Sequence, residues 1–232
     1  MRLLLIPILL TSTALPDTYI KNSVITNSVI GDNFSSTGRS SSSSLVTKNI
    51  TPKAKFSKIE ISFPAKLTIQ KSSISDIKLR IDKNFKDNIL FKVYNDTLHI
   101  EVDGTINTRL KTEIVVGTQY LDMLKVGSTT AVYIKGFNLS TFNLFVSGTA
   151  KVTFLSGHID NLSLRSEGTS RISLEKIDIN RATIVSKGTS RTTINVNEFL
   201  NVNLSAISKV KYFGNPRIKK KIKALGKLIK IN

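Results

Sequence analysis

The chain of 232 residues contains no cysteine, no tryptophan and only two histidines. Without cysteine it forms no disulfide, carries no lipidated N-terminal cysteine and offers no thiolate to a metal. His99 and His158 lie far apart and lack the spacing of metal ligands, which predicts surface or packing roles for both. We therefore expect neither a metal site nor a cofactor.

Acidic residues are also sparse, with 16 against 34 lysines and arginines. No Ser/His/Asp order, phosphate-cradling glycine loop or nucleotide fingerprint is present. An enzyme that cleaves acidic polysaccharide needs clustered carboxylates, and the best candidates are Asp160, Glu175 and Asp178. We expect these three to be separate solvated charges, so the chain is predicted not to be an enzyme.

Hydrophobic runs long enough to span a bilayer are missing. Residues 1–10 form a short basic start and an apolar run, and small residues follow at Ser12 and Ala14. This layout predicts a secretory signal peptide over residues 1–16, with cleavage near Ala14, and a buried N-terminal strand is the alternative. The predicted protein is exported to the periplasm, the cell surface or the medium, and has no transmembrane segment after cleavage.

Residues 17–48 are rich in serine and asparagine and contain five consecutive serines at 40–44. Such a segment buries too little apolar surface to offset its ordering entropy, which predicts a flexible linker, with one edge strand over 23–30 as an option. From residue 49 onward apolar and polar residues alternate in short runs, as at Ile59, Ile61 and Phe63. Period two is typical of half-buried strands, so residues 49–232 are predicted to form one all-β domain.

The strongest pattern is a repeat of about twenty residues. In the first four copies a glycine stands beside serine or threonine and precedes a short strand pattern, and two further copies, weaker in this pattern, follow. Successive copies place Gly127, Gly148, Gly168, Gly188, Ala206 and Gly226 in this position. A fixed period with strand chemistry inside each unit indicates a β-solenoid.

Each repeat carries three short apolar groups, which predicts three strands per coil and a three-faced parallel β-helix of about 20 residues per coil. Neighbouring coils would pair roughly 4.8 Å apart and share one core. We expect Thr149, Thr169 and Thr189 to form one column that hydrogen-bonds along the stack. An antiparallel sandwich with evenly spaced hairpins is the alternative.

The formal net charge of +18 predicts attraction to anionic surfaces, although many of these lysines suit the outward faces of strands. Lys151, Arg171 and Arg191 occupy equivalent positions in consecutive repeats. Cations about 5 Å apart repel unless an anion, or a carboxylate such as Glu167, intervenes. They form a candidate anion-binding strip for sulfated or phosphorylated glycans, and a solvated face is the alternative.

The C-terminal stretch contains no acid after Glu198. Its lysines include a basic patch of Lys219, Lys221, Lys223 and Lys227. As a last coil, Ile218 and Ile222 would point inward, and lysines on the edge would discourage strand addition. As a helix, the same residues would give a basic amphipathic segment suited to anionic membranes.

Several segments in order carry a family resemblance. They are Phe56-Ser-Lys-Ile59-Glu-Ile61-Ser, Asn95-Asp-Thr-Leu98-His-Ile100, the Ser-Gly-Thr blocks, Val210-Lys-Tyr212-Phe-Gly214-Asn-Pro216, and Gly226 with Ile229. Over roughly residues 50–232 the chain resembles the putative auto-transporter adhesin, head GIN domain family. The resemblance implies a right-handed parallel β-helix in an exported bacterial protein, and it transfers no catalytic or ligand residue. Glu167, Lys187 and Ala206-Ile207 depart from the family's Ser-Gly-Ser pattern and are expected to roughen one corner.

These observations predict a non-enzymatic surface or envelope protein that adheres to glycan or matrix. The alternatives are a polysaccharide-active enzyme on the same scaffold and a basic protein that binds membrane surfaces. Aromatics do not interleave with the basic strands, which argues against nucleic acid as a partner. The sequence does not determine the oligomeric state, and a homo-oligomer is compatible with it.

Overall fold

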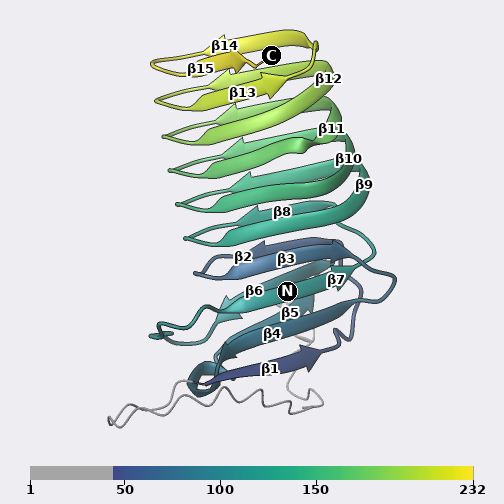
Figure 1. Cartoon of the computed structure of the whole chain (residues 1–232), viewed down its shortest axis with the longest axis vertical. Coiled ribbons are helices and arrows are strands. Elements are labelled where there is room, and N and C mark those ends of the chain that lie inside the picture. Colours follow the sequence, from purple (N-terminus) through teal and green to yellow (C-terminus); the bar gives the residue numbers. More distant parts are fainter. Residues whose placement is uncertain (1–43, 232) are drawn as a thin grey trace, which may run out of the picture.

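The computed structural model describes residues 44–231, which form fifteen strands and one short 3-10 helix. Figure 1 shows them stacked as coils along one long axis. The predicted signal peptide and residues 17–43 of the predicted linker lie outside the described residues. In chain order the elements are β1 (Leu45–Ile50), β2 (Lys58–Ile61), β3 (Lys66–Lys71), β4 (Asp76–Asp82), η1 (Lys83–Phe85), β5 (Ile89–Tyr94), β6 (Thr97–Val102), β7 (Glu113–Thr118), β8 (Met123–Val126), β9 (Ala131–Val146), β10 (Lys151–Ser166), β11 (Arg171–Ser186), β12 (Arg191–Leu204), β13 (Lys209–Phe213), β14 (Arg217–Ile222) and β15 (Lys227–Lys230).

The long strands β9 to β12 each wind around the axis and pair in parallel with the coil above and below. Alternate residues are buried along each strand, and pairs of exposed residues at 135–136 and 140–141 mark two corners of the first long coil. A tight turn makes the third corner. In β9 to β12 the front part of each strand runs to the right and the back part to the left as the stack rises, which is right-handed winding (Figure 1). The predicted parallel β-solenoid with about 20 residues per coil is confirmed.

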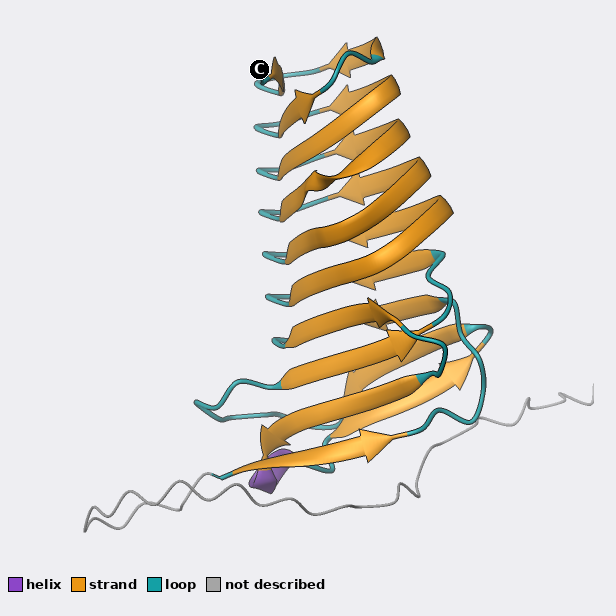
Figure 2. Cartoon of the chain, turned by 45° about the vertical axis from the view of Figure 1, so that its right-hand side comes forward, coloured by secondary structure: helices purple, strands orange, loops and turns teal. Residues whose placement is uncertain are grey.

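The tight turns stack on one edge because each has a residue with positive φ at the same place (Figure 2). Glycine adopts this conformation without the steric penalty that a side chain incurs. The stacked residues are Ser128, Gly148, Gly168, Gly188, Ala206 and Ala224. The assignments of Gly127 and Gly226 to this position were therefore wrong by one and two residues, whereas the other four were right.

The reason for the shift differs at the two ends. A Cβ on Gly127 would lie 2.5 Å from the Ser62 hydroxyl oxygen, so this glycine is needed for close packing and Ser128 makes the turn. At the other end, the amide of Gly226 donates to the carbonyl of Lys223 at 3.3 Å and closes the last turn. The coils are shorter here, because the residue with positive φ recurs after 18 residues, first from Gly188 to Ala206 and then from Ala206 to Ala224.

The hydroxyls that bond between coils are not the predicted threonines. Thr149, Thr169 and Thr189 do stack at equivalent turn positions, but within residues 44–231 no hydrogen bond joins their side chains. Buried serines bond instead: the Ser166 and Ser186 hydroxyl oxygens lie 2.9 Å apart in successive coils. The threonine column was predicted from sequence adjacency to glycine, whereas bonding requires the inward side of the turn.

The N-terminal coils do not follow chain order. Strand β2 lies between β6 and β8, and strand β3 lies between β7 and β9. All four pairings are parallel. Strands β5 and β6 form an antiparallel hairpin through Asn95 and Asp96, which both have positive φ. On the opposite wall, β4 is antiparallel to β1 and β7, which ends the stack. Because β1 begins at Leu45, the predicted linker boundary at residue 48 is too late.

The C-terminal residues form strands β13, β14 and β15 of the last coils, so the amphipathic-helix alternative is wrong. Ile218 and Ile222 stand in register with buried Leu200 and Leu204, as an inward placement requires. They stay exposed because no further described coil covers them. Lys220 stands in register with Val202, and a charge at such a position opposes the addition of another strand.

Replacing Thr192 by valine should raise the free energy of unfolding by about 1 kcal/mol. The Thr192 side chain is 1% exposed, lies in register between Ile172 and Val210, and its hydroxyl has no hydrogen-bond partner. Chemical denaturation measures the change, with outward Thr193→Val as the control that stays within about 0.5 kcal/mol of the parent. A less stable Thr192→Val protein would contradict this account of the core.

Replacing Gly157 by alanine should destabilise the fold by roughly 3 kcal/mol or more. Gly157 has φ +136°, and an added Cβ would collide with the carbonyl oxygen of Phe137 in the coil below. Gly104→Ala is the control, because Gly104 has φ +78° and an added Cβ would make only an ordinary contact, 3.7 Å from the Asn88 side-chain nitrogen. Only the cost of the left-handed backbone then remains, about 1 kcal/mol. Equal losses in the two variants would show that coil spacing at Gly157 is not limiting.

Candidate functional site

A column of basic side chains runs up the edge of the stack that carries the tight turns. The register pairs Lys151 with Arg171, Arg171 with Arg191, Arg191 with Lys209, and Lys209 with Lys227. We call these five residues the basic column. With coils about 4.8 Å apart, it extends over about 19 Å.

The turn chemistry fixes where each cation emerges. The amide of Lys151 donates to the carbonyl of Thr130 in the coil below at 2.9 Å, and the same bond recurs at 2.9 Å for each higher member. The residue before each of the first four cations is small and buried, as with Ala150 and Ser170, and the residue before Lys227 is the half-buried Gly226. Since side chains alternate between faces along a strand, the cation that follows points outward.

Within residues 44–231, none of the five cations forms an ion pair with a carboxylate. Glu167, the carboxylate expected to intervene, pairs instead with Arg165 at 2.9 Å. Neighbouring unit charges about 5 Å apart in water repel by roughly 1 kcal/mol, which their flexible side chains reduce by spreading. A bound anion would remove this repulsion, and the column is therefore suited to anionic ligands.

Below Lys151 the same register continues through Ala131 to Lys66 and Glu113. Here the charges are compensated, because Glu113 lies 3.1 Å from the Lys66 ammonium and 3.5 Å from the Arg80 guanidinium. The hydrogen bond from Lys66 is the main cause that lowers the pKa of the Glu113 carboxyl. The uncompensated part of the column therefore starts at Lys151.

The predicted basic patch divides between two places. Lys219 and Lys221 lie on β14, Lys223 begins the last turn, and Lys227 is the top member of the basic column. Lys209 and Lys227 were not assigned to the anion strip from the sequence. The signal was available for Lys209, which stands three residues after Ala206 as Arg191 stands after Gly188, but Gly226 concealed the place of Lys227.

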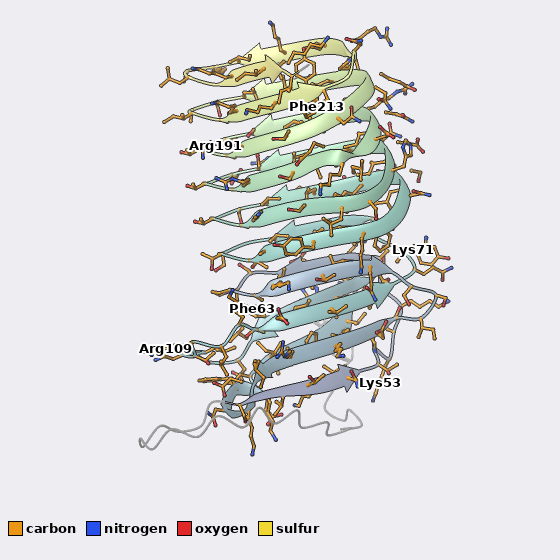
Figure 3. The ribbon with its side chains drawn as sticks, in the orientation of Figure 1. Lys53, Phe63, Lys71, Arg109, Arg191 and Phe213 are labelled. Atoms are coloured by element: carbon orange, nitrogen blue, oxygen red, sulfur yellow. The ribbon has the colours of Figure 1, made fainter. Side chains whose placement is uncertain are left out.

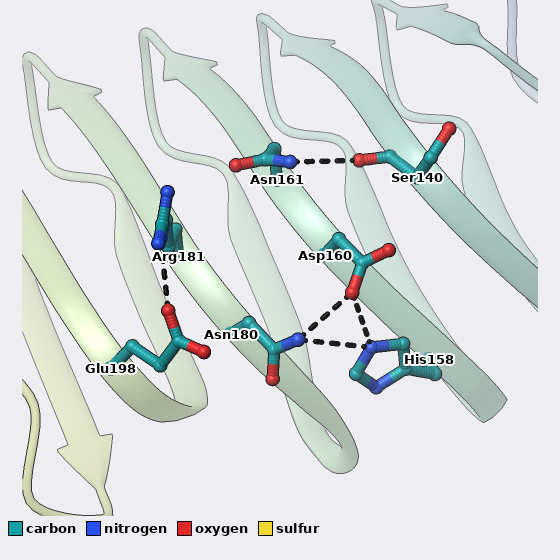
Figure 4. Close-up of polar contacts among 7 residues, drawn as sticks. All are labelled: Ser140, His158, Asp160, Asn161, Asn180, Arg181 and Glu198. Carbon is teal, nitrogen blue, oxygen red and sulfur yellow. Dashed lines mark hydrogen bonds and ion pairs between the residues drawn. The ribbon is translucent and has the colours of Figure 1, made fainter.

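Two of the three candidate carboxylates, Asp160 and Asp178, take part in separate hydrogen bonds. The Asp160 carboxylate lies 3.0 Å from the His158 ring nitrogen and accepts a hydrogen bond from Asn180 at 2.8 Å (Figure 4). Asp178 accepts from Asn195 at 2.9 Å, and Glu175 is exposed. Across the described residues, no three metal-ligating side chains come together.

The two histidines occupy unrelated surroundings. The ring of His99 stacks on Tyr94 with centroids 3.9 Å apart, and its Nδ1 lies 3.9 Å from the Glu60 carboxylate. His158 belongs to the polar cluster of Figure 4, in which Arg181 also pairs with Glu198 at 2.9 Å. These contacts give both rings packing or surface roles.

No helix within residues 44–231 has the length and apolar character that a membrane crossing requires. Among curated proteins, none matches this chain. The model of one protein family, the putative auto-transporter adhesin, head GIN domain, matches residues 55–216.

Three solved structures share the fold. A putative adhesin from Bacteroides fragilis has 20% sequence identity and a TM-score of 0.64, over 84% of this chain and 100% of that one. A putative adhesin from Parabacteroides merdae has 14% identity and a TM-score of 0.58, over 81% and 96% of the two chains. Another from Parabacteroides distasonis has 16% identity and a TM-score of 0.54, over 82% and 98%. At these identities the likeness to solved structures establishes the fold alone. The family model matches most of the solenoid, and the chain therefore belongs to the putative auto-transporter adhesin, head GIN domain family.

Proposed function

We propose that the protein is an exported, non-enzymatic surface or envelope protein that binds anionic glycans along the basic column. The observation that carries this proposal is the register of five cations without a carboxylate partner among the described residues. A linear polyanion laid along this edge meets one cation per coil. Sulfated or phosphorylated glycans supply such a repeated charge.

The rigidity of the column supports binding as well as its charge. Each cation follows a turn that is held to the coil below by backbone hydrogen bonds of 2.8–3.0 Å, for example from Thr169 to Gly148 and from Ile207 to Gly188. Because the backbone is already ordered, a ligand immobilises only side chains, which lowers the entropic cost of association. The adhesin names of the family and of the similar structures agree with an exported binding protein.

A second candidate is binding to an anionic membrane surface. Ile207 and Leu225 stand at the tips of the last two turns with 58% and 67% of their surface exposed, beside Lys209, Lys223 and Lys227. Apolar side chains among lysines are typical of interfacial binding. Liposomes separate this candidate from the first.

The double substitution Arg171→Glu plus Arg191→Glu should weaken binding to heparin, used as a sulfated polysaccharide probe, by at least tenfold at low salt. It reverses the charge at the second and third places of the basic column, while both side chains are exposed and leave the core unchanged. Binding by the parent should fall as salt rises, because release of counterions drives association with a polyanion. Surface plasmon resonance at two salt concentrations measures both effects, and melting temperature checks the fold.

Lys135→Glu plus Lys176→Glu is the matched control, because it changes the net charge equally at a different corner. It should retain most of the affinity. An equal loss in both variants would assign binding to the overall charge of the protein, and unchanged binding in the column variant would remove the column. Binding to anionic liposomes but not to heparin, lost in Ile207→Ser plus Leu225→Ser, would favour the membrane candidate instead.

A further inference from the structure

A groove of about 730 Å³ opens at the lower end of the turn edge. Three segments line it: residues 63–66, residues 102–112 and residues 129–133. Figure 3 shows Arg109 reaching out from the edge that also carries Arg191, with Phe63 further in. Figure 2 shows the cause, since one long loop protrudes here below the stacked tight turns. This loop, residues 103–112, joins β6 to β7 where the higher coils use four-residue turns.

Hydrogen bonds hold two walls of the groove in place. The Thr108 hydroxyl donates to the buried Asp82 carboxylate at 2.7 Å, and the amide of Leu110 donates to the Thr108 hydroxyl at 3.1 Å. On the facing wall, the buried Thr130 hydroxyl donates to the carbonyl of Phe63 at 2.6 Å. The groove is therefore a built feature, and its volume falls within the usual range of ligand pockets.

The lining combines apolar side chains with cations. Its apolar members come from all three segments and are Phe63, Pro64, Ala65, Val102, Ile106, Leu110, Ala131 and Tyr133. Lys66, Arg109 and Lys111 also line the groove, and no aspartate or glutamate does. Glu113 compensates Lys66, whereas within the described residues Arg109 and Lys111 form no ion pair with a carboxylate. The groove thus offers an apolar surface next to two uncompensated positive charges.

We propose that this groove binds a single-chain anionic amphiphile, with an acyl chain on the apolar surface and a carboxylate or phosphate between Arg109 and Lys111. The complementarity has two parts. The apolar lining removes methylene groups from water, and each buried methylene strengthens binding about fourfold. The arginine and lysine form charge-assisted hydrogen bonds with the head group.

A sugar acid without an acyl chain would use only the charged part of the groove. Its hydroxyls would meet mainly apolar side chains, those of Phe63, Ile106 and Leu110. The proposal does not depend on the basic column. Ala131 interrupts that column between Lys66 and Lys151, so the groove and the column have separate cations. Amphiphile binding in the groove can therefore be absent while glycan binding along the basic column is present, and the reverse also holds.

Isothermal titration of the whole chain with dodecanoate, below its micelle concentration, tests the site. Dodecyl phosphate should also bind, which tests whether the head group is a carboxylate, a phosphate or either. Decanoate should bind roughly tenfold to twentyfold more weakly than dodecanoate, because it has two methylenes fewer. Dodecanol, which has the chain without the charge, should bind at least tenfold more weakly.

Two variants locate the site. Arg109→Ala plus Lys111→Ala should weaken dodecanoate at least tenfold and leave dodecanol unchanged, whereas Ala131→Trp should fill the groove and weaken both. The control is Lys135→Ala plus Lys176→Ala, which removes the same charge elsewhere and should bind dodecanoate like the parent. Melting temperatures report folding, and heparin binding should be retained by the Arg109/Lys111 variant. No dodecanoate binding by the folded parent, or equal binding in all folded variants, would overturn the proposal.

Discussion

Closure of the upper coils in four-residue turns, from residues 127–130 to residues 223–226, is the constraint on which the structure depends. The turn requires positive φ at one residue. From Ser128 to Gly188, the carbonyl of that residue accepts a hydrogen bond from an amide in the next coil, as from Thr189 to Gly168 at 2.8 Å. A Cβ on Gly168 would lie 2.6 Å from the carbonyl oxygen of Gly148, so glycine also sets how closely the coils approach. Because the turns repeat in register, the strands that leave them start in register too.

That shared start places apolar and charged residues with the same accuracy. Val152 and Ile172 stack in the core because they lie one residue after Lys151 and Arg171, which stack on the surface. Burial of the first column supplies the hydrophobic stabilisation that a single coil lacks. The second column places like charges together at a cost that is modest in water. A regular core therefore imposes regular surface chemistry, whether or not a ligand is bound.

The spacing in the sequence predicted the repeat and its register, but not the hydroxyls that bond between coils or the features that lie outside the repeat. The period, the three faces and the register of Lys151, Arg171 and Arg191 follow from spacing alone, and the structure bears out each. The position of β2 and β3 between later strands could not be predicted, because an alternating pattern shows that a strand is half-buried without identifying its partner. Gly157 was missed for a related reason: it lies outside the repeat, at a register shift between β9 and β10.

Both proposed sites lie on the turn edge, and the same physical reason explains both. Packing restricts which side chains the core accepts. An outward residue next to a turn has a fixed position, but many different side chains fit there. Where the turn is tight, as at Gly168, one outward cation follows it in each coil, and these residues form a line of cations on the surface. Where residues 103–112 replace the tight turn, the chain has enough length to stand away from the coil and enclose a groove. Loop length at one corner thus decides whether this scaffold presents a linear charged edge or a pocket, without any change to the coils that support it.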